Sequence, residues 1–132
     1  MAKEIINVAY RPTYARKFVL PLSPGTKAGG FIFVSGAGGY EDRKTGKPIE
    51  GIEAQTRQCI EHVKEVIEAA GSSLADVVKV TVFLTNAANF QKMNEVYVTY
   101  FPKDPPARSA IVTNLLLSDM LIEMECIAYQ SR

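Results

Sequence analysis

The sequence predicts an α+β fold in which a mixed β-sheet carries two helices on one of its faces. Residues 52–70 and 90–100 repeat apolar side chains every three or four positions, which is the spacing of one helix face. Residues 77–84 and 121–129 alternate in polarity, which is the period of strands with two different faces. The order of strands, helix, strand, helix and strands places both helices on the same side of the sheet.

The N-terminal third predicts strands joined by turns. Residues 31–35 combine β-branched and aromatic side chains between glycines, and residues 17–20 form a weaker strand candidate that ends at Pro21. The glycine-rich run 36–39 lacks the spacing of a phosphate-binding loop, and no helix opens after it, so we interpret it as a turn. Residues 42–48 are polar with Gly and Pro, which indicates a loop or hairpin connection.

The helix at 52–70 is the clearest local prediction. Its apolar stripe includes Ile60 and Ile67, charged residues fill the opposite face, and Gly71 is typical of a helix end. His62, the only histidine, falls away from that stripe, so we expect it to lie in solvent.

The second half of the chain predicts a strand, a helix and two further strands. In the strand predicted at 77–84, Val78 is one of the alternating residues that we expect on the buried face of the sheet. Cap candidates at 86–89 begin the second helix, which Pro102 ends, and 109–112 resumes as strand.

The last strand, 121–129, has one uncharged face that we expect to pack under the helices. Glu123 and Glu125 then point to the other face of the sheet, together with Phe83 and Ile127. Because no predicted helix covers this second, partly apolar face, the sequence favours self-association.

Composition limits the class of protein. A chain of 132 residues fits a single domain, 1–132, with 47% hydrophobic and 22% charged residues. The net charge of +1 gives no electrostatic reason to expect binding to nucleic acid or to a membrane surface. No run approaches the roughly 20 apolar residues that span a bilayer, and we expect no secretory signal. Cys59 and Cys126 are too few for a disulfide scaffold or zinc site, so we expect reduced core residues and a cytoplasmic protein.

Arg108 is the strongest candidate for a binding residue. It follows Pro105 and Pro106, which stiffen the backbone, and a fixed arginine can hold a carboxylate with two hydrogen bonds. Glu123 is the candidate acid/base partner, with a pKa raised by an apolar sheet face and lowered by a nearby arginine. The alternative for both residues is a surface or interface salt bridge.

Short motifs in a fixed order carry a resemblance to a known family. The chain resembles the RidA/YjgF family of reactive intermediate deaminases in five segments, over nearly the whole length from about Pro21. They are Val34-Ser35-Gly36, residues 54–58 (AQTRQ), residues 71–80 (GSSLADVVKV), residues 94–97 (NEVY) and residues 105–109 (PPARS).

This resemblance implies a chorismate-mutase-like α+β fold assembled as a homotrimer, with three sites in the clefts between subunits. Members of the family hydrolyse 2-imino acids, or their enamine tautomers, to 2-keto acids and ammonia without a metal or organic cofactor. Arg108 would hold the substrate carboxylate, and Glu123 would position the attacking water with main-chain groups around Ala110. The other residues that match pocket positions are Ser35, Gly36 and Asn94.

Three residues depart from the family pattern. Leu22 replaces the usual tyrosine, Ala110 replaces the usual cysteine, and Ala37 replaces a common glutamine. The loss of the tyrosine hydroxyl predicts a more apolar pocket and a shifted preference, towards a larger or more apolar imine or enamine.

Two other functions stay open at this point. One is a non-catalytic protein that binds a carboxylate metabolite in the same cleft, which the replacements at Leu22 and Ala110 leave possible. The other is an RNA-directed protein, because some relatives have been described as ribonucleases. The near-neutral charge, without a basic stripe or an aromatic platform, argues against RNA.

Overall fold

The computed structural model describes residues 2–17 and 20–131, in which six strands form one sheet in the order β1-β2-β3-β6-β4-β5. The helices are α1 (Thr13–Lys17), α2 (Ile52–Ala69) and α3 (Phe90–Tyr100), with short 3-10 turns η1 (Leu74–Asp76) and η2 (Ala87–Asn89). The strands are β1 (Glu4–Ile6), β2 (Gly25–Ala28), β3 (Phe31–Gly38), β4 (Val77–Leu84), β5 (Ala107–Val112) and β6 (Ile122–Tyr129).

The sheet is mixed, as predicted, because β4 and β5 run parallel while the other neighbours are antiparallel. A parallel pair needs a long crossover, and α3 supplies it between β4 and β5. β6, the last strand in the chain, lies in the middle of the sheet between β3 and β4.

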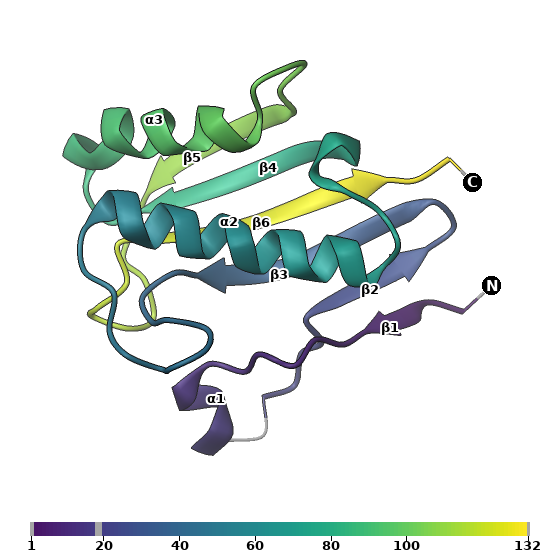
Figure 1. The fold of residues 1–132 in the computed structure, drawn as a ribbon, viewed down its shortest axis with the longest axis horizontal. Helices are drawn as coiled ribbons and strands as arrows, with labels where there is room; N and C mark the ends of the chain where they lie inside the picture. The colour runs from purple at the N-terminus through teal and green to yellow at the C-terminus, as the bar shows by residue number, and fades with distance from the viewer. Residues whose placement is uncertain (1, 18–19, 132) are drawn as a thin grey trace.

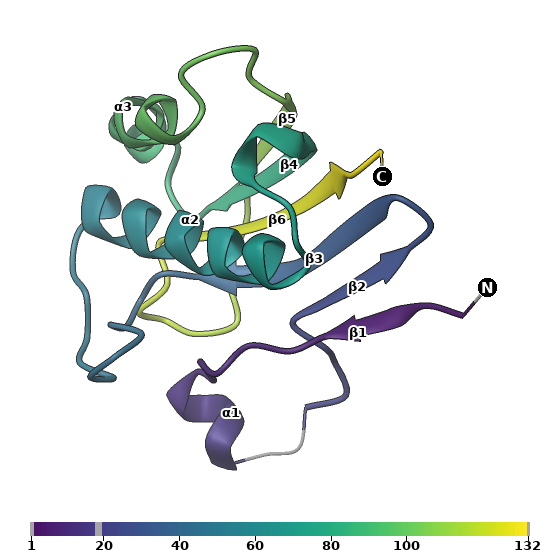
Figure 2. The same cartoon turned by 45° about the vertical axis from the view of Figure 1, so that its right-hand side comes forward.

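Helices α2 and α3 pack against the same face of the sheet, which we call the helix face (Figure 1). The turned view in Figure 2 shows both helices on this one side and α1 beyond the edge of the sheet that β1 forms. The core between the layers contains Ile60, Val66 and Ile67 of α2 against Ile32 and Ile122 of the sheet. Each such side chain contributes about 1.5–3 kcal/mol by its burial.

The opposite face, which we call the open face, carries no helix. Side chains that alternate with the core residues form it, and several are large, apolar and exposed: Phe31, Phe33, Ile111 and Tyr129. Phe31 and Tyr129 contact each other with ring centroids 4.9 Å apart. The predicted uncovered apolar face is therefore present in the chain.

The N-terminal third departs most from the sequence prediction. Strands β1 and β2 and helix α1 were not predicted, because they are short and have no clear periodicity. The strand expected at 17–20 is wrong where it is described, since Lys17 ends α1 and Leu20 lies outside any strand, while residues 18 and 19 lie outside the described residues. The turn expected at 36–39 is also wrong, because β3 continues through Gly38.

One bulge reverses an expected burial in β4. Between Val77 and Lys79 the register against β6 shifts, so the strand carries an extra residue. Val78 is consequently 46% exposed, against expectation, and Val77 takes the buried position at 6%. Both cysteines are free and buried in the core, as predicted. None of the helices in the described ranges is long and apolar enough to cross a membrane.

Gln55 and Gly39 hold the first turns of α2 against neighbouring parts of the chain. The buried Gln55 donates from Nε2 to the carbonyl oxygens of Ile49 and Asp119, both at 2.9 Å, and accepts from the Leu121 amide. Gly39 lets the chain after β3 pass against α2, because an added Cβ would overlap the Gln55 carbonyl and lie 2.9 Å from the Cys59 nitrogen.

We predict that Gly39→Ala destabilises the protein by about 1–3 kcal/mol, the usual cost of overpacking against atoms that cannot move. Urea denaturation measures the change. Gly46→Ala is the matched control, since its added Cβ meets only Thr13 Oγ1 at 3.7 Å and its cost comes from a φ of 73°. If Gly39→Ala were as stable as the wild type, the close packing of α2 at this point would be wrong.

Candidate functional site

Ser35 and Gly36 lie together on a β-bulge in β3. Val34 pairs with Cys126 and Ala37 pairs with Met124, so Ser35 and Gly36 both face the single residue Glu125 across the ladder. Such bulges bend a strand and redirect its side chains, and they occur often beside functional sites. The Ser35 hydroxyl donates to the Ser23 carbonyl oxygen at 2.5 Å, which ties the bulge to the segment before β2.

Glu123 lies on the open face of β6, half-buried beside this bulge. An added Cβ on Gly36 would overlap Glu123 Oε2 and lie 3.1 Å from Glu123 Cδ, so the carboxylate occupies the space that a side chain at Gly36 would need. Burial raises the pKa of Glu123, and the nearby Glu125 carboxylate raises it further. The lowering of the pKa that we expected from Arg108 is absent.

Arg108 lies on β5 and points to the helix face, opposite Val80 of β4. Its Nη1 donates to Asn94 Oδ1 of α3 at 2.8 Å. The guanidinium carbon lies 4.7 Å from the Tyr97 ring centroid and 5.5 Å from that of Phe90. These contacts hold the guanidinium in one place, yet among residues 2–17 and 20–131 no carboxylate pairs with it.

Ala110 follows two residues later on the same side of β5 and pairs with Val82. Because β5 forms the edge of the sheet, part of its main chain near Ala110 has no neighbouring strand. This edge therefore leaves N–H and C=O groups available near Arg108.

A single chain divides the predicted site residues into two groups. Arg108, Asn94 and Ala110 lie on the helix side of edge strand β5, whereas Glu123 and Gly36 meet on the open face, around β3 and β6. The division explains why Arg108 is not among the causes of the Glu123 pKa shift. One chain does not bring Arg108 to Glu123.

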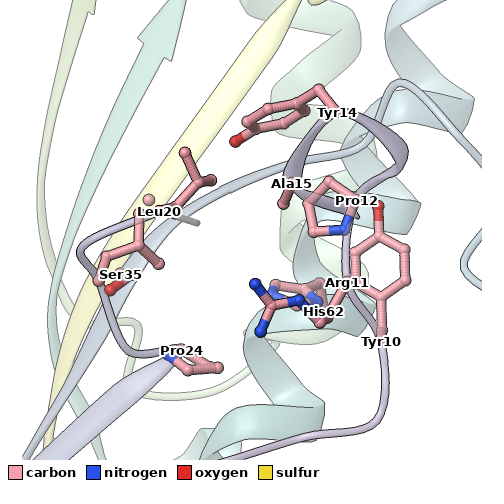
Figure 3. A pocket seen from close by; sticks show the side chains of 11 residues that line it. Tyr10, Arg11, Pro12, Tyr14, Ala15, Leu20, Pro24, Ser35 and His62 are labelled. Atoms are coloured by element: carbon pink, nitrogen blue, oxygen red, sulfur yellow. The ribbon is translucent and has the colours of Figure 1, made fainter. Parts of the chain in front are cut away.

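Leu22, Ser35 and Gly36 share a cavity of ≈ 80 Å³ with the N-terminal segment (Figure 3). A buried water needs about 10–15 Å³ of such space, so the cavity has room for several waters or a small side chain. Sequence reasoning missed its other wall, which residues 10–15 and Leu20 form. The Pro12-Thr13 pair was the available signal, because proline is common where a helix begins.

Glu41 fixes this segment in place. Its buried carboxylate accepts hydrogen bonds from the Tyr10 hydroxyl at 2.9 Å, the Thr13 amide at 2.8 Å and the Thr13 hydroxyl at 2.7 Å. Negative charge at the start of α1 also satisfies an amide that a helix leaves unpaired. These three hydrogen bonds to one carboxylate therefore hold Tyr10 and Thr13 in place, and with them the outer wall of the cavity.

His62 is not in solvent, contrary to the prediction. The N-terminal segment covers this side of α2, and the His62 ring packs edge-on against Tyr10 with centroids 5.1 Å apart. Burial lowers the pKa of His62 to about 4, and Nδ1 is buried without a hydrogen-bond partner. In the described part of the chain, no group of three or more His, Cys, Asp or Glu residues is placed to hold a metal ion.

We predict that His62→Phe changes how stability depends on pH. The folded-state pKa of about 4 lies below the ordinary 6.5, so the unfolded chain binds more protons between these values. The wild type should therefore lose stability through this site as pH falls from 6.5 towards 4, and the variant, which keeps a ring against Tyr10, should not. Urea denaturation at several pH values measures this, and a difference in stability that stays constant from pH 7.5 to 4 would contradict it.

Comparison with known proteins identifies the family. Residues 14–130 match the family model described as Endoribonuclease L-PSP. A RutC family protein of Pyrococcus abyssi is 47% identical over 131 residues, which are 98% of this chain and 99% of that protein.

Two solved structures share the fold. RidA from the Antarctic bacterium Psychrobacter sp. PAMC 21119 has a TM-score of 0.85 at 35% identity, covering 96% of this chain and 99% of that one. E. coli TdcF with bound serine has a TM-score of 0.86 at 32% identity, covering 97% and 99%. The resemblance found in the motifs is thus confirmed, and the chain belongs to the endoribonuclease L-PSP family, which includes the RutC and Rid proteins.

Proposed function

We propose that this protein is a cofactor-free deaminase that hydrolyses 2-imino acids, or their enamine tautomers, to 2-keto acids and ammonia. The observation that carries the proposal is Arg108, a guanidinium held by Asn94, Tyr97 and Phe90 with no acidic partner among the described residues. An arginine fixed before the ligand arrives loses little freedom on binding a carboxylate.

Glu123 is the group proposed to activate water. A half-buried carboxylate with a raised pKa is a stronger base than an exposed one, and it can accept a proton from water in the pocket. The water oxygen adds to the carbon of the C=N bond, and Glu123 takes one of its protons. Glu123 passes this proton to the imine nitrogen, which gives a tetrahedral intermediate that carries a hydroxyl and an amino group. As the C–N bond of this intermediate breaks, the hydroxyl proton moves through Glu123 to the nitrogen, so ammonia leaves and the hydroxyl oxygen becomes the carbonyl oxygen of the 2-keto acid.

Arg108 and Glu123 can act on one substrate only if they come from different chains, because within one chain they lie on opposite faces of the sheet. We therefore propose a homotrimer with each site between two subunits. The exposed apolar side chains of the open face, such as Phe33 at 43% and Ile111 at 47%, support burial by a second copy.

The substrate is proposed to be a small carboxylate with an apolar side chain. Leu22 and Leu20 line the cavity beside Glu123. Main-chain groups of the edge strand near Ala110 would hold the attacking water, where other members of the family have a cysteine. A relative, E. coli TdcF, has been solved with serine bound, which is also a small carboxylate. A cytoplasmic location, with both cysteines free, fits this metabolic role.

The same observation leaves a second candidate, a protein that binds a carboxylate metabolite without turning it over. The serine-bound TdcF structure favours it, because serine is not an imine. Turnover assays therefore decide between the two functions.

We predict that Arg108→Lys lowers kcat/KM about 100-fold, or roughly 2.7 kcal/mol, because lysine keeps the charge but loses the paired hydrogen bonds. The assay follows ammonia or keto acid from 2-iminopropanoate and 2-iminobutanoate generated in situ. Arg57→Lys, on the exposed surface of α2, is the matched control and should behave as the wild type.

Two results would contradict the proposed deaminase activity. A wild type no faster than Arg108→Ala on any imino acid would exclude this deaminase activity. Serine or keto-acid binding that Arg108→Ala abolishes, measured by calorimetry without any turnover by the wild type, would establish the binding protein instead.

We also predict that Phe33→Asp, which places a charge on the open face, converts a trimer of the 14.5 kDa chain into monomers. Burying an unpaired carboxylate costs several kcal/mol, which is enough to dissociate an assembly. Light scattering after gel filtration measures the mass. Val98→Asp, at an exposed apolar position on α3, should leave the trimer intact. A monomeric wild type would contradict the assembly.

A further inference from the structure

Tyr14 lies where the two cavities at the bulge meet. It lines the ≈ 80 Å³ cavity with Leu22 and Ser35, and a second cavity of ≈ 40 Å³ with Gly36 and Glu123. Figure 3 shows its ring extending from α1 over the cavity, with the hydroxyl on the side of Leu20. The hydrogen bonds from Thr13 to Glu41, one residue earlier, fix the start of this helix.

The Tyr14 hydroxyl is the one free to act among the hydroxyls that line these cavities. Tyr10 donates its proton to Glu41, and Ser35 donates to the Ser23 carbonyl oxygen. The Tyr40 oxygen also lacks a hydrogen-bond partner, but protein atoms enclose it, so it is not exposed to a water or ligand in the cavity. The Tyr14 oxygen is accessible and makes no hydrogen bond within residues 2–17 and 20–131.

We propose that Tyr14 is a further catalytic residue of the site, and that its hydroxyl donates a hydrogen bond to the water that Glu123 activates. This rests on the proposed deaminase function. The water would donate one proton to Glu123 and accept a hydrogen bond from the Tyr14 hydroxyl at one of its lone pairs. Its second lone pair would attack the imine carbon. Tyr14 keeps its proton in this step, so the charges balance as before.

The electrostatics support a donor rather than a phenolate. Burial raises the pKa of Tyr14, and the carboxylates of Glu123 and Glu41 raise it further, so the hydroxyl stays protonated at neutral pH. Several groups surround Glu123 from the elements packed around it. They are Glu125 on β6, Tyr14 on α1, Tyr10 before α1, Tyr40 and Glu41 after β3, and Cys59 and His62 on α2.

The test compares Tyr14→Phe with the wild type in two measurements. Steady-state kinetics on 2-iminopropanoate should show kcat reduced about 10- to 100-fold with KM little changed, the effect of losing one donor at the reacting atoms. Titration of the Glu123 carboxyl by ¹³C NMR, assigned with Glu123→Gln, should show a pKa raised above that of the wild type. The hydrogen-bonded water favours the charged carboxylate, so its loss raises the pKa.

Tyr100→Phe is the matched control, because its hydroxyl donates to Glu61 on the helix layer, away from the cavities. It should change neither measurement. An unchanged kcat with an unchanged Glu123 pKa would overturn the inference, and so would a higher KM at constant kcat. If the wild type shows no turnover, the proposed function fails and the titration alone decides: a raised Glu123 pKa in Tyr14→Phe supports the contact, and an unchanged one overturns it.

Discussion

The central position of β6 decides where the candidate site residues can lie. Successive side chains of a strand point to opposite faces, so Met124 enters the core while Glu123 must face away from the helices. Pairing with β3 on one side and β4 on the other leaves β6 no freedom to rotate. Arg108, two strands away and on the helix face, is separated from Glu123 by the sheet itself.

The N-terminal segment completes what the sheet begins. β2 pairs with β3 only as far as Val34, so at the bulge the edge is formed by the segment before β2, held by hydrogen bonds from Ser35 to Ser23 and Pro24. Residues 10–15 cover that edge, held by Glu41 rather than by a strand ladder. The cavity at Leu22 is consequently not lined by apolar side chains alone, because Tyr14 brings a hydroxyl to the same space.

Local periodicity was enough to predict α2, α3, β4 and β6, since each is long and buries one regular face. It failed wherever burial depends on distant partners. His62 was misplaced because Tyr10, far away in the sequence, covers it. Val78 was misplaced because a bulge is a property of two paired strands, and the hydrogen bond between Arg108 and Asn94 joins two elements whose packing periodicity does not give. The motifs predicted the family but not the division of the site within a chain.

If Arg108 holds the substrate carboxylate as proposed, that division separates recognition of the carboxylate from recognition of the rest of the ligand. Arg108 depends on α3 and β5 for its position, whereas the cavity at Leu22 depends on the N-terminal segment and β3. Within the described residues, the side chains that hold Arg108 and those that line the cavity have no member in common, so each group can vary while the other keeps its geometry. On this sheet, substitutions at the cavity can therefore change which side chain fits there without disturbing the position of the Arg108 guanidinium.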